Sequence, residues 1–113
     1  MAGLEKVPRP HKKTPYTLYF ATSSARKGWR DVSATRVSDL GKAWDILTHT
    51  PLDTTPLNYP LKAELQWVTW KSQTYQRWQL KPSLSAGVRI WYFVDGTRVF
   101  IEKVHTHHPN QTK

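Results

Sequence analysis

One stretch near the end of the chain, GVRIWYFVDGTRVFIEKV at residues 87–104, constrains the fold more than any other. Two runs of aromatic and β-branched residues flank Asp95-Gly96, a dipeptide that two-residue hairpin loops prefer. The pattern therefore predicts a β-hairpin with strands at 87–94 and 97–106. Because an isolated hairpin is barely stable in water, these strands should belong to a larger sheet.

The two faces of this hairpin differ in character. If Asp95 and Gly96 form the loop, Val94 faces Thr97, and alternate residues then share a face. One face is apolar and should meet helices; it carries Val88, Ile90, Tyr92, Val94, Val99 and Ile101. The other face mixes charge with aromatic rings, pairing Arg89 with Glu102, Trp91 with Phe100 and Phe93 with Arg98. Such a mixture of charged and aromatic side chains is suited to a solvent-exposed binding or catalytic surface.

The rest of the chain supplies further strands and two helices. The predicted elements are a strand at 16–22, a helix over ARKGWRDV with Ser23 or Ser24 as N-cap, a helix at 36–50, a proline-rich loop at 51–60, and strands at 64–70 and 74–81. In the second helix the apolar residues at helical spacing are Val37, Leu40, Ala43, Trp44 and Leu47. The order β-α-α-β-β-β-β predicts an α+β fold, with a mostly antiparallel sheet and a helical hairpin on one face.

Charge and composition narrow the range of partners. The chain has 113 residues, enough for one domain, and a net charge of +9. Residues 1–15 carry four Lys or Arg against Glu5, which predicts a flexible basic tail of net +3 before a single domain at 16–113. The remaining +6 predicts an anionic partner. No apolar run is long enough to span a membrane, and there is no cysteine, so we expect a cytoplasmic protein without a membrane partner.

A second arginine is expected beside Arg89. In TYQRWQL, placing Trp78 toward the core puts Arg77 on the same side of the sheet as Arg89. Two arginines among aromatic rings suit an anionic backbone with bases that can stack. The alternative is a pair of solvated arginines on an outer sheet face, with Arg89 paired to Glu102. Among the other tryptophans, Trp29 and Trp44 are expected in the core with Trp78, whereas Trp67, Trp70 and Trp91 suit either the core or base stacking.

The chain ends on HTHHPNQTK, with three histidines in four positions. One hypothesis makes this segment part of an active site, because imidazole titrates near neutral pH. The alternatives are a terminus without a role and a metal site built on His-x-His spacing. No third ligand is close in sequence, so no metal is expected. The chain also lacks a glycine-rich phosphate loop, and we expect no cofactor.

Taken in order, several of these segments resemble the RelE/ParE superfamily of bacterial toxins. The similar segments are a first strand followed by SARKGWRDV, a second helix ending AWDILTHTP, the loop into YPLKAEL, and YQRWQL followed by the closing hairpin. The pattern small residue–x–Arg–aliphatic–x–Tyr at 87–92 is the most specific element. The resemblance covers about residues 16–108.

This resemblance implies a microbial RNase-like fold and a toxin neutralised by an antitoxin, whose acidic segment would cover the basic face. Many RelE-type members cut mRNA in the ribosomal A site, whereas ParE-type relatives poison DNA gyrase. By the same resemblance, Arg89 matches the arginine at the scissile phosphate. Arg77 and Lys81 lie on the strand that supplies further basic groups, and His107 and His108 match C-terminal catalytic positions.

Cleavage of RNA by its own 2′-hydroxyl requires a base, cations near phosphorus and an acid for the leaving oxygen. Arg89 and Arg77 suit charge stabilisation, and His107 or His108 suits proton transfer, with Glu64 or Glu102 as an alternative base. Expected RNA-binding residues are Lys62, Lys81, Trp91 and Lys113. The favoured hypothesis is thus a ribosome-dependent mRNA endoribonuclease; the alternatives are a ParE-like gyrase inhibitor and a non-catalytic RNA-binding module.

Overall fold

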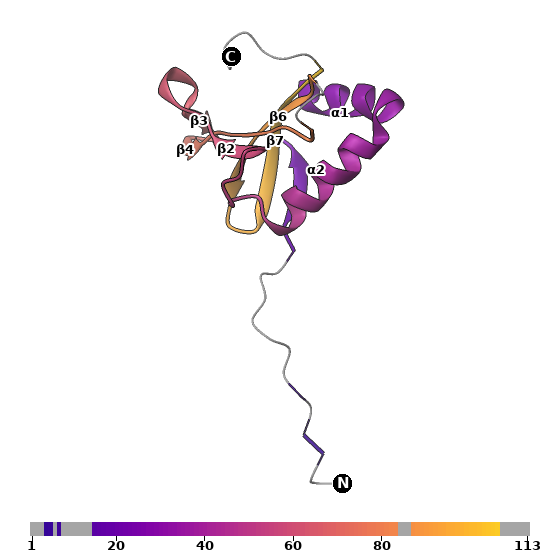
Figure 1. Cartoon of the computed structure of the whole chain (residues 1–113). Helices are drawn as coiled ribbons and strands as arrows, with labels where there is room; N and C mark the ends of the chain where they lie inside the picture. The colour runs from indigo at the N-terminus through magenta and orange to yellow at the C-terminus, as the bar shows by residue number, and fades with distance from the viewer. Residues whose placement is uncertain (1–3, 6, 8–14, 84–86, 107–113) are drawn as a thin grey trace.

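The computed structural model describes residues 4–5, 7, 15–83 and 87–106 (Figure 1). The elements, in order, are β1 (Thr17–Phe20), α1 (Ser23–Thr35), α2 (Val37–His49), β2 (Asn58–Pro60), the 3₁₀ helix η1 (Ala63–Leu65), β3 (Trp67–Trp70), β4 (Gln73–Gln76), β5 (Trp78–Leu80), β6 (Arg89–Asp95) and β7 (Arg98–His105). Most of the predicted tail at 1–15 lies outside the described residues, so the division into a tail and a domain at 16–113 stays a prediction. No helix in the described part of the chain is long and apolar enough to cross a membrane.

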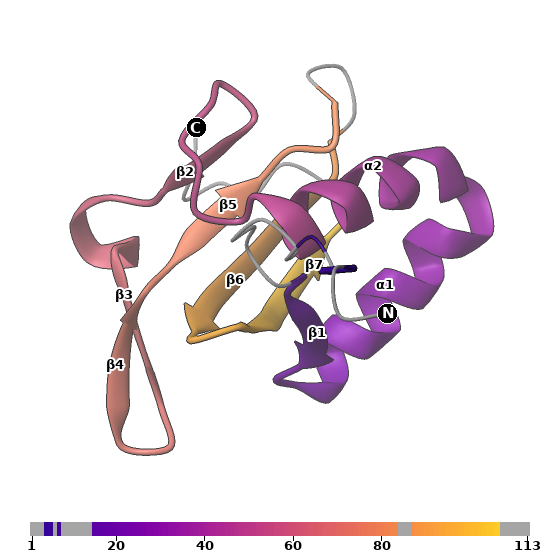
Figure 2. The same cartoon turned by 90° about the horizontal axis from the view of Figure 1, so that it is seen from below.

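A five-stranded sheet forms the centre of the fold, in the order β1-β7-β6-β5-β2. β1 runs parallel to β7, and every other neighbouring pair in this sheet is antiparallel. Figures 1 and 2 show α1 and α2 together on one face of the sheet, and the β3–β4 hairpin reaching out on the other side. The predicted α+β class, with a helical hairpin on one face of a mostly antiparallel sheet, is confirmed.

The main core lies between the two helices and the sheet. Its buried side chains include Leu40 and Leu47 of α2 with Ile90, Tyr92 and Ile101 of the hairpin. Helix α1 approaches the sheet closely at Gly28, where an added Cβ would lie 2.5 Å from the carbonyl oxygen of Val104. A glycine is therefore required at this crossing of α1 over β7.

Two apolar residues expected on the buried side of α2 are exposed instead. Trp44 is 51% exposed and Val37 is 69% exposed, although both lie at helical spacing with buried residues of α2. Helical periodicity shows which residues lie on one side of a helix, but it does not show how many of them the neighbouring sheet covers. Trp29 is partly buried against the core, and Trp78 is buried as expected.

Several predicted boundaries change because the strands are shorter and more numerous than the pattern indicated. The predicted loop at 51–60 contains β2, and the predicted strand at 64–70 begins with η1. The predicted strand at 74–81 is divided between β4, in the outer hairpin, and β5, in the main sheet. Helix α1 continues through the predicted break at 33–35, and its N-cap is Thr22, whose hydroxyl accepts a 2.9 Å hydrogen bond from the Ala25 amide.

The closing hairpin forms as predicted, but its register differs. Asp95 pairs with Arg98, so the loop is Gly96-Thr97 rather than Asp95-Gly96. Gly96 takes a φ of +63° at the first loop position, where a type II′ turn requires glycine. An ion pair between Arg98 and Asp95 at 3.5 Å closes this loop. Compared with the predicted register, each residue of β6 near the turn pairs two residues further along β7. A shift by two leaves every side chain on the face predicted for it, so the apolar face still meets the helices.

Candidate active site

A bulge in β7 determines which side chains meet at the far end of the hairpin. Tyr92 pairs with Ile101, but the next pair is Trp91 with Lys103, so Glu102 is an extra residue between them. Beyond the bulge, Arg89 pairs with His105. The predicted pairs Arg89–Glu102 and Val88–Lys103 are therefore wrong.

Arg89 begins β6 and is 7% exposed. Its Nη1 donates a 2.9 Å hydrogen bond to the carbonyl oxygen of Val88. Its strand partner His105 lies on the same side of the sheet, the side away from the helices, because directly paired residues of antiparallel strands share a face. The expectation of two solvated arginines on an open face is thus wrong for Arg89, which is buried.

His105 has the environment of a neutral imidazole. Burial, and next the positive charge of Lys103, lower its pKa below the ordinary histidine value, while Glu102 acts in the opposite direction. Its Nε2 atom is buried and has no hydrogen-bond partner among the described residues. A neutral imidazole on the same face as an arginine is of the chemical type that accepts a proton.

Trp91 connects His105 to the neighbouring strands. The two rings meet edge to face with centroids 4.4 Å apart, and the indole N–H donates a 2.9 Å hydrogen bond to Oε1 of Gln79. The amide of Gln79 in turn donates to the hydroxyl of Tyr59 at 2.9 Å. Because Trp91 is 6% exposed and Gln79 is 1% exposed, Trp91 does not offer a free ring for base stacking. It serves instead as a buried platform beneath the polar groups.

Arg77 is held on this platform by Glu102. Its Nε and Nη2 donate to the two carboxylate oxygens of Glu102 at 2.7 and 2.8 Å, and its guanidinium lies 5.3 Å from the centre of the Trp91 ring. Its Nη1 also donates to the carbonyl oxygen of Leu65 at 3.2 Å. Arg77 therefore lies on the same face as Arg89, as predicted, but it is Arg77 rather than Arg89 that pairs with Glu102.

The end of this face nearest the hairpin turn is apolar. The β3–β4 hairpin covers it with Val68, Trp70 and Tyr75, which pack on Phe93 and Phe100 to form a second small core. Trp70 lies 4.5 Å from Phe100 between ring centres, and Tyr75 lies 4.9 Å from Phe93. Of the tryptophans with two possible roles, Trp70 thus belongs to a core, whereas Trp67 is 54% exposed.

The other predicted site residues divide into three groups. Lys81 lies with its Nζ 5.1 Å from the centre of the Tyr59 ring, next to the Gln79–Tyr59 hydrogen bond. Lys62 and Glu64 are exposed at η1, and among the described residues neither forms an ion pair or hydrogen bond with the two arginines. His107, His108 and Lys113 lie outside the described residues. No group of three or more metal-ligating side chains occurs within the described ranges.

His105 is the functional candidate that sequence reasoning missed. In a strand without a bulge, His105 would lie opposite a residue that precedes Arg89. The extra residue Glu102 shifts the pairing of β7 with β6 by one position, and this shift brings His105 opposite Arg89. Tyr59 and Gln79 were missed for a related reason, since β2 was not predicted. The signals available were the HTHH cluster itself and the charged Glu102-Lys103 pair at the centre of an otherwise apolar strand.

At the level of sequence, no family model and no curated protein matches this chain. Solved structures do. The YoeB dimer from Staphylococcus aureus is similar with a TM-score of 0.57 at 14% identity, over 82% of this chain and 98% of that one. The heterotetrameric YoeB–YefM toxin–antitoxin complex from the same organism gives 0.56 at 14% identity, over 81% and 97%. A YoeB/ParE toxin from Agrobacterium tumefaciens gives 0.56 at 18% identity, over 80% and 98%. The chain therefore has the fold of these YoeB and YoeB/ParE toxins.

Proposed function

We propose that this chain is the toxin of a toxin–antitoxin pair and acts in the cytoplasm as a ribosome-dependent mRNA endoribonuclease. The observation that carries the enzymatic part is the pairing of Arg89 with His105 on the polar end of the sheet. The fold shared with YoeB toxins supports the toxin role, and the known YoeB–YefM complex supports an antitoxin partner.

In the proposed reaction the RNA's own 2′-hydroxyl is the nucleophile, and side chains of this chain transfer protons and stabilise charge on the ribosome-bound mRNA. His105, which burial favours in its neutral form, accepts the proton of the 2′-hydroxyl. The 2′-oxygen then forms a bond to phosphorus while the bond to the 5′-oxygen breaks, leaving a 2′,3′-cyclic phosphate and a free 5′-hydroxyl. Arg89 stabilises the charge that develops on the phosphate oxygens. His107 and His108 are the candidates for the acid that protonates the leaving oxygen.

The remaining predicted residues take supporting roles in this proposal. Arg77 holds Trp91 and the bulge through Glu102, and adds positive charge to the site. Lys81, Lys62 and Lys113 are proposed RNA-backbone contacts, and Glu64 is an alternative base. Trp91 is proposed as a support for His105, because its burial excludes stacking on a free base.

The test is cleavage of a defined mRNA on programmed ribosomes by the purified chain. We expect cuts within the A-site codon, 2′,3′-cyclic phosphate ends, and little cleavage of the same mRNA without ribosomes. The absence of cleavage in both conditions would contradict the enzymatic proposal.

A second candidate is inhibition of DNA gyrase, favoured by the likeness to a protein described as a YoeB/ParE toxin. A gyrase inhibitor acts through protein contacts and does not require the Arg89–His105 pair. Inhibition of gyrase supercoiling that survives loss of both side chains would favour this candidate. Ribosome binding without any cleavage would instead favour a non-catalytic RNA-binding module.

A further inference from the structure

The carbonyl oxygen of the bulged residue Glu102 is hydrogen-bonded by a side chain rather than by the backbone of a neighbouring strand. β1 pairs with β7 as far as Phe20 and Ile101, and the Ala21 amide then donates a 2.8 Å hydrogen bond to the carbonyl oxygen of Ile101. The next carbonyl oxygen along β7 belongs to Glu102. It accepts a 2.8 Å hydrogen bond from the hydroxyl of Thr22, the second residue after β1.

Two consecutive carbonyl groups of β7 are therefore hydrogen-bonded from the side of β1. In a regular strand successive carbonyl groups point to opposite neighbours, so the carbonyl after that of Ile101 would point toward β6. The bulge turns the Glu102 carbonyl toward β1 instead. The Thr22 hydroxyl thus stabilises the bulged form of β7 in particular, because a regular strand would not present this oxygen to it.

The same hydroxyl also begins α1. Its oxygen accepts the 2.9 Å hydrogen bond from the Ala25 amide that caps the helix, while its proton is donated to Glu102. A hydroxyl can donate and accept at the same time, whereas a carboxylate can only accept. Thr22 therefore joins three parts of the fold through one oxygen atom: the end of β1, the start of α1 and the bulge of β7.

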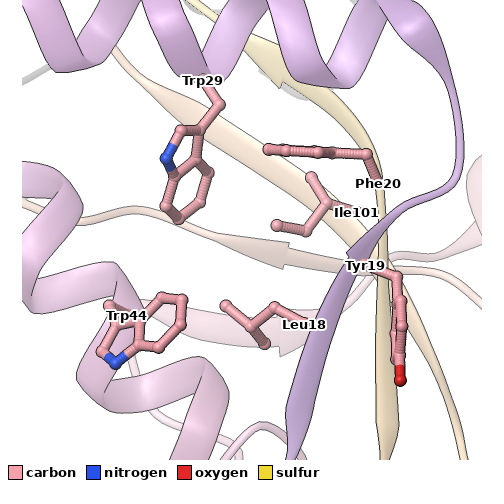
Figure 3. A pocket seen from close by; sticks show the side chains of 6 residues that line it. All are labelled: Leu18, Tyr19, Phe20, Trp29, Trp44 and Ile101. Carbon is pink, nitrogen blue, oxygen red and sulfur yellow. The ribbon is translucent and has the colours of Figure 1, made fainter.

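Aromatic packing fixes the place of Thr22 beside the bulge. Phe20 meets Trp29 of α1 edge to face, with ring centroids 6.0 Å apart. Figure 3 shows these two rings next to Ile101, the residue of β7 that comes directly before the bulge. The backbone of Thr22 is extended, with φ −138° and ψ 158°, so it continues the direction of β1. The hydroxyl is thus held in position by the elements on both sides of it.

The bulge in turn determines the arrangement of the candidate active site. The carboxylate of Glu102 binds Arg77 at two points, and the residues after the bulge bring His105 opposite Arg89. If the pairing of Tyr92 with Ile101 continued without the extra residue, His105 would lie opposite Val88 and its side chain would change to the helix side of the sheet.

We infer that Thr22 is a positioning residue of the candidate active site: its hydroxyl holds the Glu102 carbonyl in the bulged conformation and thereby keeps His105 opposite Arg89. Thr22 acts through the backbone of β7 and not through contact with RNA. The inference rests on the proposed function only for its effect on mRNA cleavage.

The experiment uses variants that separate the two hydrogen bonds of this hydroxyl. Thr22→Ser keeps both bonds. Thr22→Asp keeps an acceptor for the Ala25 amide, since Asp is a preferred N-cap residue, but near neutral pH its carboxylate has no proton to donate to Glu102. Thr22→Val removes both bonds. Ser24→Asp is the matched control, because it adds the same charge to the first turn of α1 and leaves Thr22 in place.

Two of the measurements are made on the full chain without RNA. Nuclear Overhauser effects between the rings of His105 and Trp91, whose centroids lie 4.4 Å apart, report the position of the histidine. Thermal melting reports the stability of the fold. The third measurement is single-turnover cleavage of mRNA on saturating ribosomes, with ribosome affinity measured in parallel.

We expect Thr22→Ser and Ser24→Asp to match wild type in all of these measurements. Thr22→Asp should melt close to wild type, because the helix cap is kept, but its ring-to-ring signals should weaken. It should also cleave mRNA roughly tenfold or more slowly with unchanged ribosome affinity, since a misplacement of about 1 Å can cost about 10²-fold in rate. Thr22→Val should show the same losses together with a lower melting temperature.

Wild-type ring-to-ring signals in Thr22→Asp would overturn the inference, because the helix cap alone would then be sufficient. Equal losses in Ser24→Asp would overturn it as well, because added charge would then explain them. Equal cleavage rates for wild type and Thr22→Asp would overturn the inference and leave the proposed enzyme standing. A wild-type chain that does not cleave mRNA would refute the proposed enzyme, and the ring-to-ring signals would still decide the role of Thr22.

Discussion

Arg77, which lies between β4 and β5, forms a two-point ion pair with Glu102 in the bulge of β7, with N–O distances of 2.7 and 2.8 Å. The two side chains are only 13% and 16% exposed, so if either one were removed, water could not easily hydrogen-bond to the other. The same arginine lies over Trp91 and binds the Leu65 carbonyl. The pair therefore fixes the register beyond the bulge, and with it the pairing of Arg89 with His105.

Removing the carboxylate should destabilise the fold measurably. We expect Glu102→Gln to lower the free energy of unfolding by about 1.5–3 kcal/mol, the usual value of a hydrogen bond to a charged group. The control is Arg98→Ala, which breaks the exposed 3.5 Å pair with Asp95 and should cost less than about 1 kcal/mol. Urea denaturation checks both; equal losses would contradict the structural role assigned to Arg77 and Glu102.

The close crossing of α1 over β7 predicts opposite effects for two glycines. Gly28→Ala should lower the melting temperature, because its Cβ would lie 2.5 Å from the Val104 carbonyl oxygen, and overpacking of this kind costs about 1–3 kcal/mol. Gly41→Ala meets nothing within 4 Å in α2 and should raise stability by up to about 1 kcal/mol, from helix propensity alone. A Gly28→Ala variant as stable as Gly41→Ala would show that α1 packs differently.

Gln79 should support the site without contacting RNA. Gln79→Leu leaves the buried indole N–H of Trp91 without its acceptor, which costs about 1–3 kcal/mol of stability. We expect the maximal rate of mRNA cleavage to fall while ribosome affinity changes little, because Trp91 contacts the His105 ring. A parallel fall in ribosome affinity would mean that Gln79 acts on binding instead.

The lowered pKa of His105 predicts how stability depends on pH. Because burial lowers this pKa in the folded state, the unfolded chain binds more protons in the window below the ordinary value of about 6.5. Stability should thus fall as pH drops through that window and level off below the folded pKa. His105→Gln should reduce this fall in melts between pH 7 and pH 5; an unchanged slope would show that another group titrates.

The sequence predicted the parts of the fold that depend on local patterns. Alternation placed Ile90, Tyr92 and Ile101 toward the helices and Arg77 on the same face of the sheet as Arg89. It could not predict the bulge at Glu102, because that bulge depends on an ion pair with a residue 25 positions away. The pairing of His105 with Arg89 depends on the same bulge.

Other features were not predicted because the local amino-acid sequence does not indicate them. β2 has three residues and ends on a proline, so its composition indicates a loop. The β3–β4 turn uses Lys71 and Ser72 with φ of 49° and 68°, a left-handed pair without glycine that sequence reasoning does not expect. The exposure of Trp44 depends on how far α2 stands from β1, which no periodicity reveals.

The pairing of Arg89 with His105 is the central claim, and single-turnover cleavage of mRNA on saturating ribosomes tests it most directly. The variants are His105→Ala and Arg89→Lys, which keeps a positive charge at this buried position, with His49→Ala as a matched histidine control on α2. We predict that His105→Ala cleaves roughly 10²–10⁴-fold more slowly, the usual value of a positioned acid or base, with ribosome binding nearly unchanged. Arg89→Lys should also be slow, because an ammonium cannot reproduce the planar two-point contact to phosphate. Cleavage by folded His105→Ala at the wild-type rate would contradict the account and shift the proton chemistry to His107, His108 or Glu64.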